Sequence, residues 1–361
     1  MSLSQSIAYQ RPRYPRGIFW LWMVAGCIMG CISEYVPDTG DFTPKLVVDG
    51  LITNQAGPYT VRLYYSEPYL SRDPTTKLRG ATVFIKDNQG GQTQLMEVDR
   101  GNYATTDSTF RGVVGRYYQI EIVLSDGKQY RSIPELLKAP TPVDTVYGVF
   151  KEGNVINDRF EVITEFKDKA NQENYFKWKW KHFQEISVCK IIDQTPPVPP
   201  IRRIYNCCSP CWSILSSSQV DVLSDALSDG KTIKHMLTTI PYDSKDPYYL
   251  LIEQYELTKN AYLFWKQTEN QTTNAGGIFD TPPSQIIGNI QCVSTPSEQV
   301  LGYFVVAGLT VKPSYVLRNG ISKPPYQPIN TLDNLQKINV PVCEPCQESL
   351  GRTAIRPPAW K

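Results

Sequence analysis

The sequence predicts a mainly β protein with two β-sandwich domains in tandem, each immunoglobulin-like or transthyretin-like. Segments of alternating apolar and polar residues recur with turn residues between them, at a spacing of about 8–12 residues that is typical of sandwiches. Proline (28 of 361 residues) and tyrosine (22) are frequent, which suits strands and turns more than helices. Apolar residues make up 41% of the chain and charged residues 20%, so it can bury a sizeable core.

The amino-terminal segment predicts export. Residues 11–16 carry three arginines and no acid, and residues 18–30 are uncharged and mostly apolar. A basic stretch before an apolar run of this length is typical of a signal peptide, and the run is too short to cross a bilayer as a stable helix. We therefore expect a lipoprotein signal peptide over residues 1–30 and a tether over residues 31–45; the alternative is a buried helix at the start of the folded domain.

Two cysteines in this segment follow small residues, as the acceptor of a bacterial lipoprotein signal does. Cys27 has the better local match, but cleavage before it would leave an apolar Ile-Met-Gly at the start of the mature chain. Cleavage before Cys31 removes the whole apolar run. We therefore predict that Cys31 carries the lipid, with Cys27 as the alternative, and that several acyl chains on one cysteine hold the protein on a membrane where a single chain would be marginal.

The first sandwich is predicted over residues 46–138. Alternation of apolar and polar residues predicts strands at 46–53, 59–66, 81–87, 93–98, 117–125 and 128–133. Turn sequences such as Asn88-Gln89-Gly90-Gly91 and Asp126-Gly127 separate them. No helical period interrupts this series, which favours a sandwich.

A proline-rich joint is predicted over residues 139–145, because Pro140 and Pro142 oppose both a helix and a central strand. The second domain, residues 146–361, is expected to be β-rich with cysteine-containing loops. Its predicted strands are 146–150, 159–168, 175–183 and 248–257. In 175–183 aromatic and charged residues alternate, which predicts one buried and one solvated face.

A short helix is expected after the strand 248–257. Thr258 is suited to its N-cap, and helical spacing then runs from residue 260 to 272. Tyr262 and Trp265 fall on one face of it. Core packing and a ligand platform are the two interpretations of this aromatic pair.

Seven cysteines lie beyond the signal segment, and in an exported chain they predict disulfides. They are Cys189, Cys207, Cys208, Cys211, Cys292, Cys343 and Cys346. Two C-x-P-C pairs also admit half of a zinc site or a redox motif, but their wide separation and proline-rich loops favour structural disulfides. Because seven is odd, either one thiol stays free, or Cys27 is lipidated and Cys31 joins the paired set.

Charge and motifs limit the function classes. The net charge of +2 gives no field that would attract a nucleic acid. Only His182 and His235 are available to histidine-dependent chemistry, and no nucleophile elbow, zinc-protease motif or phosphate loop is present. We expect no metal site and no cofactor.

Several long blocks, in order, resemble a known family. They are CISEYVPD (31–38), LVVDGLITNQAGPYTVRLYYSEPY (46–69), GATVFIKDNQG (80–90), GNYATT (101–106), CCSPCWSIL (207–215), residues 261–290, VLGYF (300–304) and CEPCQESLGRTAIRPPAW (343–360). They resemble the Bacteroidetes outer-membrane lipoproteins of the domain-of-unknown-function 4249 family, which are encoded beside TonB-dependent receptors. The resemblance favours Cys31 over Cys27 as the start of the mature chain. It does not place Cys189 or Cys292 in the family pattern.

The resemblance implies a lipid-anchored protein of the outer membrane, on the cell surface or the periplasmic face, with a TonB-dependent receptor as its partner. It implies no reaction. We therefore expect a non-enzymatic binding or accessory protein for nutrient uptake; the alternative is an exported carbohydrate-active or other hydrolase with a carboxylate site. Candidate partner or ligand contacts are Trp212, Trp265, Phe279 and Asp280, and for Asp280 a loop-fixing role is the competing interpretation.

Overall fold

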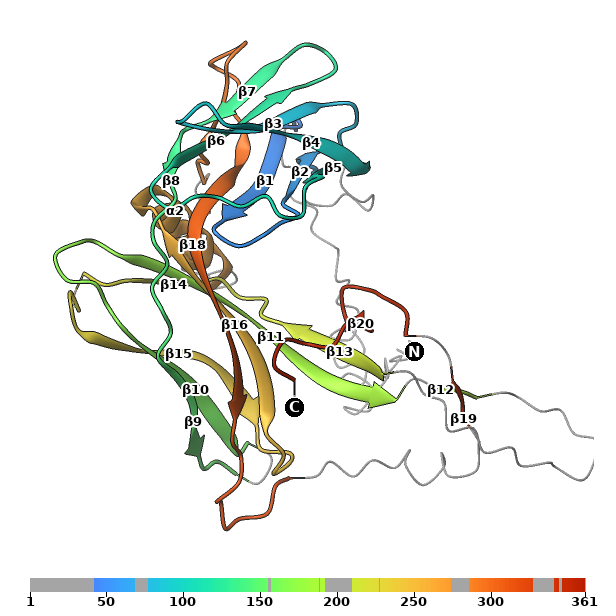
Figure 1. The fold of residues 1–361 in the computed structure, drawn as a ribbon, viewed down its shortest axis with the longest axis vertical. Coiled ribbons are helices and arrows are strands. Elements are labelled where there is room, and N and C mark those ends of the chain that lie inside the picture. The colour runs from blue at the N-terminus through green and yellow to red at the C-terminus, as the bar shows by residue number, and fades with distance from the viewer. Residues whose placement is uncertain are drawn as a thin grey trace, which may run out of the picture. The chain divides into compact units, whose positions relative to one another are not determined.

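The computed structural model (Figure 1) describes residues 42–68, 77–154, 157–187, 189–191, 210–226, 228–273, 286–326, 341–343 and 346–360. The chain divides into Met1–Thr43 and Pro44–Lys361, and everything below concerns the second unit. Cys27 and Cys31 lie outside the described residues.

Strands dominate this unit, which confirms the mainly β prediction. They are β1 (Leu46–Thr53), β2 (Thr60–Tyr65), β3 (Thr82–Asp87), β4 (Gln92–Asp99), β5 (Asn102–Thr105), β6 (Tyr117–Val123), β7 (Gln129–Ser132), β8 (Glu135–Leu136), β9 (Thr145–Lys151), β10 (Arg159–Lys167), β11 (Tyr175–Ser187), β12 (Cys189–Ile191), β13 (Pro210–Ser216), β14 (Asp221–Ser224), β15 (Thr232–Pro241), β16 (Tyr248–Leu257), β17 (Ile290–Cys292), β18 (Leu301–Val316), β19 (Pro341–Cys343) and β20 (Arg352–Thr353). The helix of the described residues is α2 (Lys259–Thr273).

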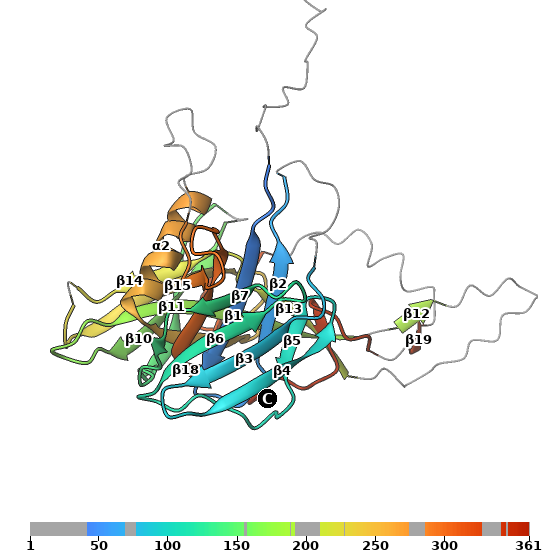
Figure 2. The ribbon, with the colours of Figure 1, turned by 90° about the horizontal axis from the view of Figure 1, so that it is seen from above.

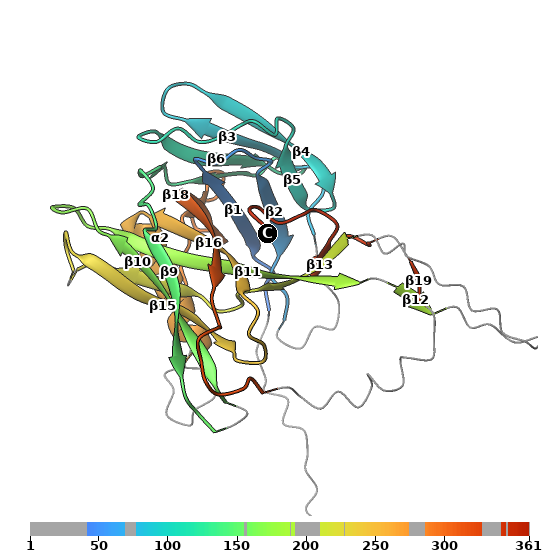
Figure 3. The ribbon, with the colours of Figure 1, turned by 60° about the horizontal axis from the view of Figure 1, so that its bottom comes forward.

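Fifteen strands form one sheet with the order β17-β7-β6-β3-β4-β5-β2-β1-β18-β16-β11-β13-β20, with β14 on β11 and β8 on β6. A three-stranded sheet, β15-β10-β9, and a two-stranded sheet, β12-β19, are separate from it. Figure 3 shows the three-stranded sheet on one side of the unit and β1 to β6 on another.

The first hydrophobic core lies inside the amino-terminal strands. Alternate residues of β1, β2, β3 and β6 point into it, as the period-2 pattern predicts. Residues from much later in the chain complete this core: Ile290, Cys292, Val300, Phe304 and Val306. The amino-terminal strands therefore do not bury their core alone.

Strand β18 connects the two halves of the large sheet. Its first half pairs in parallel with β1, from Val47 opposite Leu301 to Thr53 opposite Ala307. Its second half pairs antiparallel with β16, from Glu256 opposite Gly308 to Tyr248 opposite Val316. In Figure 1, β18 begins beside β1 and continues alongside β16.

A second core lies between the three-stranded sheet and the far part of the large sheet. Its members come from β10, β11, β15, β16 and the end of β18, and include Phe166, Phe176, Trp178 and Ile252. A third cluster packs α2 onto the outer face of β16 and β18 through Ala261 and Phe264. Figure 2 shows α2 beside β14 and β11.

The helix begins as predicted. The Ala261 backbone N–H donates a 3.2 Å hydrogen bond to the Thr258 hydroxyl, the geometry of an N-cap. Within the described residues, no helix has the length and apolar character that crossing a membrane requires.

The proline-rich segment is fixed in place. Thr141 is buried, and its carbonyl oxygen accepts hydrogen bonds from the Gln254 side chain and the Thr310 hydroxyl, both at 2.9 Å. A Cβ on Gly308 would lie 2.3 Å from the Lys138 carbonyl oxygen, so β18 packs tightly beneath the segment. Residues 138–141 thus lie on the sheet.

Candidate functional site

A groove of about 840 Å³ lies between the two sheets of the carboxy-terminal part and the end of α2. Strand β11 supplies Trp178 and Trp180, β15 supplies residues 236–239, and the turn after β13 supplies residues 217–220. The last turns of α2 add Glu269, Thr272 and Thr273. Its volume falls within the range of about 300–1,000 Å³ that ligand sites occupy.

Aromatic rings form the floor of the groove. The Trp178 indole is buried, donates a 2.9 Å hydrogen bond to Gln254, and stacks on the His235 ring with centroids 4.0 Å apart. Trp180 is half-buried and lies two residues along the same face of β11. Met236 on β15 is 51% exposed. The groove therefore presents apolar surface that the fold itself does not cover.

Polar side chains form the walls. Ser217 is tied to β11 in both directions: its N–H donates to the Trp180 carbonyl at 2.9 Å, and its hydroxyl accepts from the Trp180 N–H at 3.2 Å. This places the exposed Ser218 and Gln219 at the rim. Thr238 and Thr239 stand on the β15 side. Hydroxyl and amide groups can both donate and accept, so these walls suit a polar ligand.

The two carboxylates of the groove already have basic partners. Both Asp221 oxygens lie 2.9 Å from His235 Nε2, and Glu269 lies 2.5 Å from Lys266 Nζ. A glycosidase acid needs a proton that it can release, from a carboxyl group whose surroundings raise its pKa. The geometry therefore favours binding over hydrolysis.

Trp212 and Trp265, the two candidate contacts from the sequence that the structure describes, do not line the groove. Trp212 is 4% exposed and packs against Phe183, Tyr249 and Trp360, so here it belongs to a core cluster. Trp265 is half-buried on α2, with Lys177 over its ring. Phe279 and Asp280 lie outside the described residues.

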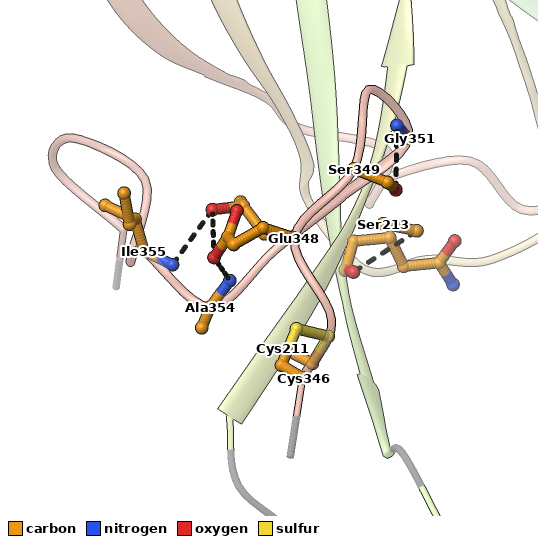
Figure 4. The surroundings of a disulfide bond; sticks show 10 residues. Cys211, Ser213, Cys346, Glu348, Ser349, Gly351, Ala354 and Ile355 are labelled. Carbon is orange, nitrogen blue, oxygen red and sulfur yellow. Dashed lines mark hydrogen bonds between the residues drawn. A yellow bond between two sulfur atoms is a disulfide. The ribbon is translucent and has the colours of Figure 1, made fainter. Parts of the chain in front are cut away.

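Two of the candidate cysteines form a disulfide. Cys211 on β13 is bonded to Cys346, 135 residues later, with Cα atoms 5.5 Å apart. Figure 4 shows Cys346 at the start of a segment in which Glu348 accepts a 2.6 Å hydrogen bond from the Ala354 N–H. The bond therefore ties the carboxy-terminal segment to β13.

Cys292 corrects a prediction, because it is a free thiol rather than half of a disulfide. It is buried in the first core, and its Sγ accepts a 3.3 Å hydrogen bond from the Thr295 N–H.

The other candidate cysteines are Cys189, Cys343, Cys207 and Cys208. The backbone pairing of β12 with β19 places Cys189 directly opposite Cys343. Cys207 and Cys208 lie outside the described residues.

Three aspartates come close enough to share a cation. One oxygen of each of Asp168, Asp225 and Asp229 lies within 4.8 Å of the others. Burial raises the pKa of Asp225, and the charge of Asp168 adds to the rise. Asn174 donates to Asp168 at 2.9 Å through its side chain and to Asp225 at 3.0 Å through its N–H. These bonds join two loops, which explains the cluster without an ion.

Sequence reasoning did not identify the groove. The alternation in 175–183 pointed to Trp178 and Trp180 as one face of a strand, but the walls come from turns and from β15, which carried no clear strand signal. His182, the other histidine, lies outside the groove: it stacks on Tyr248 at 3.7 Å, and burial lowers its pKa.

Comparison with known proteins gives one match. A family model described as a domain of unknown function (DUF4249) matches residues 32–312. The match spans β1 to the middle of β18 and so includes every strand that lines the groove. Among curated proteins, the search for relatives finds no match.

Proposed function

Because this chain belongs to the family of the domain of unknown function DUF4249, we propose that it is a lipid-anchored accessory protein of the outer membrane that binds a nutrient molecule. In this proposal it works with a TonB-dependent transporter. The family resemblance supports the membrane and the partner, and the signal-like segment with Cys31 supports the anchor. The geometry of the groove supports binding.

The observation that carries the binding role is the composition of the groove. An indole face at Trp180 and an exposed thioether at Met236 lie among hydroxyl and amide side chains, while both groove carboxylates already have a basic side chain as partner. A ligand with a flat apolar face and polar edges fits this surface. We propose an oligosaccharide as the ligand class.

The two-sandwich organisation is part of the proposal. Two core clusters support it, one that includes the first half of β18 and one that includes its end. The proposed domains are residues 46–138 and 146–361, with residues 139–145 as the joint. Residues 290–306 then belong in space to the first sandwich. The groove lies within the second.

A titration of the exported chain with oligosaccharides, followed by calorimetry, tests the ligand. Trp180→Ala should weaken binding by about tenfold or more, since central aromatic contacts dominate such surfaces. Tyr117→Ala is the matched control, because this tyrosine is 45% exposed on the distant strand β6. Equal affinities in all three proteins would contradict the proposal, and cleavage of the oligosaccharide would establish a hydrolase instead.

Co-purification tests the partner. The protein, extracted from outer membranes in mild detergent after cross-linking, should elute with a TonB-dependent receptor. Elution without any receptor, while oligosaccharide binding is retained, would remove the transporter from the proposal and keep the binding role.

A further inference from the structure

A second cavity, of about 130 Å³, lies on the opposite face of β11, beneath α2. Its polar lining comes from five elements: Asp49, Arg62, Lys177, Lys179, Tyr255 and Trp265. Alternate residues of a strand face opposite sides, so Lys177 faces this cavity while Trp178 faces the second core and the groove. Arg62 is 63% exposed and Lys179 is exposed, so the cavity opens to solvent past them.

Lys177 is an unusual residue to find buried. It is 6% exposed, and its Nζ lies 2.8 Å from the centroid of the Trp265 ring. Within the described part of the chain, its Nζ has no hydrogen-bond acceptor and no ion-pair partner. Buried lysines are otherwise paired almost without exception.

A second residue that lines this cavity, Trp265, also carries an unsatisfied donor. The Nε1 of Trp265 is buried and has no acceptor among the described residues. Buried indole N–H groups usually have a partner, since leaving one unpaired costs about 1–3 kcal/mol. Two residues that line one small space, Lys177 and Trp265, therefore each carry a donor without an acceptor.

Asp49 and Tyr255, the possible acceptors among the cavity side chains, already have other partners. Asp49 on β1 accepts a 3.0 Å hydrogen bond from Arg62 Nε on β2. Tyr255 on β16 donates its hydroxyl to Glu253 at 2.6 Å. Lys179, on β11 itself, adds positive charge. The cavity thus has an excess of donors and of positive charge.

We propose that this cavity binds a short-chain monocarboxylate, held by Lys177 Nζ and Trp265 Nε1. A carboxylate only accepts hydrogen bonds, so it satisfies both donors and supplies the missing countercharge. Leu51, Leu257 and Val305 form the apolar wall, which suits a short aliphatic tail better than inorganic phosphate. One water needs about 10–15 Å³, so the cavity has room for such an acid.

Binding should be coupled to proton uptake. Burial lowers the pKa of Lys177 to about 6, with Lys179 adding to the drop and Asp49 opposing it. The amine is therefore largely neutral at pH 7.5 in the free protein. A bound carboxylate favours the ammonium, so the protein should take up close to one proton for each ligand.

The experiment is calorimetry with acetate, propionate and butyrate on the full exported chain at pH 7.5, in two buffers of different ionisation enthalpy. Supporting results are saturable binding, a buffer-dependent enthalpy that reports proton uptake, and a loss of about tenfold or more in affinity for Lys177→Met. Trp265→Phe, which keeps a ring and removes the N–H, should also weaken binding. Lys181→Met is the matched control on the same strand face, since Lys181 is half-exposed and outside the cavity.

Three results would overturn the proposal. They are no binding of any of the three acids, equal affinity in Lys177→Met, and phosphate binding as tight as the carboxylates. The oligosaccharide titration of the groove is independent of all three, because Trp180 does not line this cavity.

Discussion

The Thr141 hydroxyl donates a 2.6 Å hydrogen bond to the carboxylate of Glu256, which lies 115 residues later in the chain. Both residues are buried. The bond joins the proline-rich segment to β16 and satisfies one oxygen, Oε2, of a carboxylate whose pKa is raised by burial. A segment that its composition marks as a linker is therefore anchored at its centre.

Thr141→Val should destabilise the protein by about 1–3 kcal/mol at pH 7, because it leaves a buried carboxylate without its donor. The sign of the pH dependence follows from the raised pKa of Glu256. A carboxyl group whose pKa is higher in the folded protein than in the unfolded chain lowers the free energy of unfolding at pH values above its unfolded pKa. As the pH falls toward 4 the carboxyl group becomes protonated, so the destabilisation caused by Thr141→Val should shrink. Urea unfolding at both pH values checks this, with the exposed Thr60→Val as control. An equal loss in the two variants would contradict it.

Gly302→Ala should be severely destabilising. Gly302 has a φ of +86°, and its added Cβ would lie 2.0 Å from the Val48 carbonyl oxygen, inside the β1–β18 pairing. Gly320→Ala separates backbone strain from collision, because Gly320 has a similar φ of +82° and no atom within 4 Å of the added Cβ. We expect Gly320→Ala to cost about 1–2 kcal/mol and Gly302→Ala several more. Thermal unfolding of both variants measures the difference, and similar melting temperatures would refute it.

Lys177→Met should stabilise the protein at pH 7. The folded-state pKa of about 6 lies below the ordinary 10.5, so folding of the wild type releases a proton and its stability falls as pH drops from 10.5 toward 6. The gain in the variant should therefore be greatest below pH 6 and disappear near pH 10.5, with a slope of up to about 1.4 kcal/mol per pH unit. Chemical unfolding across this range measures it. A difference that does not change with pH would show that Lys177 keeps an ordinary pKa.

Cys346→Ser should lower the free energy of unfolding by about 2–4 kcal/mol, because the Cys211–Cys346 bond closes a long loop in the unfolded chain. A reductant should lower the free energy of unfolding of the wild type more than that of this variant.

Non-reducing peptide mapping should recover the Cys211–Cys346 pair. It should also find Cys292 as a thiol that is alkylated only after unfolding.

Cys31→Ser should abolish labelling with palmitate and release the protein from membranes, if Cys31 is the acylated residue. The parallel variant Cys27→Ser should keep both the label and the membrane association. The reverse pattern would assign the lipid to Cys27.

The local pattern of apolar residues predicted the position of many strands, but it did not predict which strands pair with one another. Residues 46–53 and 248–257 are strands with the predicted bounds, because continuous or alternating apolar residues leave few other ways to bury them. Strand β18 was missed. Its parallel pairing with β1 joins residues that are 254 positions apart, for example Val47 and Leu301, and no local signal encodes this.

The cavity was missed for a related reason. In 175–183 the alternation correctly predicted buried aromatic residues, but its charged face was expected to be solvated. Lys177 is buried because α2, which begins 82 positions later in the chain, covers that face with Trp265. Likewise, the odd number of cysteines allowed a free thiol as one of two alternatives but could not identify Cys292, which is buried in the core that surrounds it.

The parallel pairing of β1 with β18 has a consequence for how the chain is made. The ribosome synthesises β1 about 250 residues before β18, the strand that pairs with it. Until β18 is made, one edge of β1 is unpaired and the first core lacks Phe304 and Val306. A chain truncated before residue 301 never acquires β18, so the edge of β1 stays unpaired and the first core stays incomplete. Fragments that stop at the proline-rich segment should therefore aggregate, whereas a fragment of the amino-terminal strands supplemented with a peptide of residues 286–309 should recover solubility.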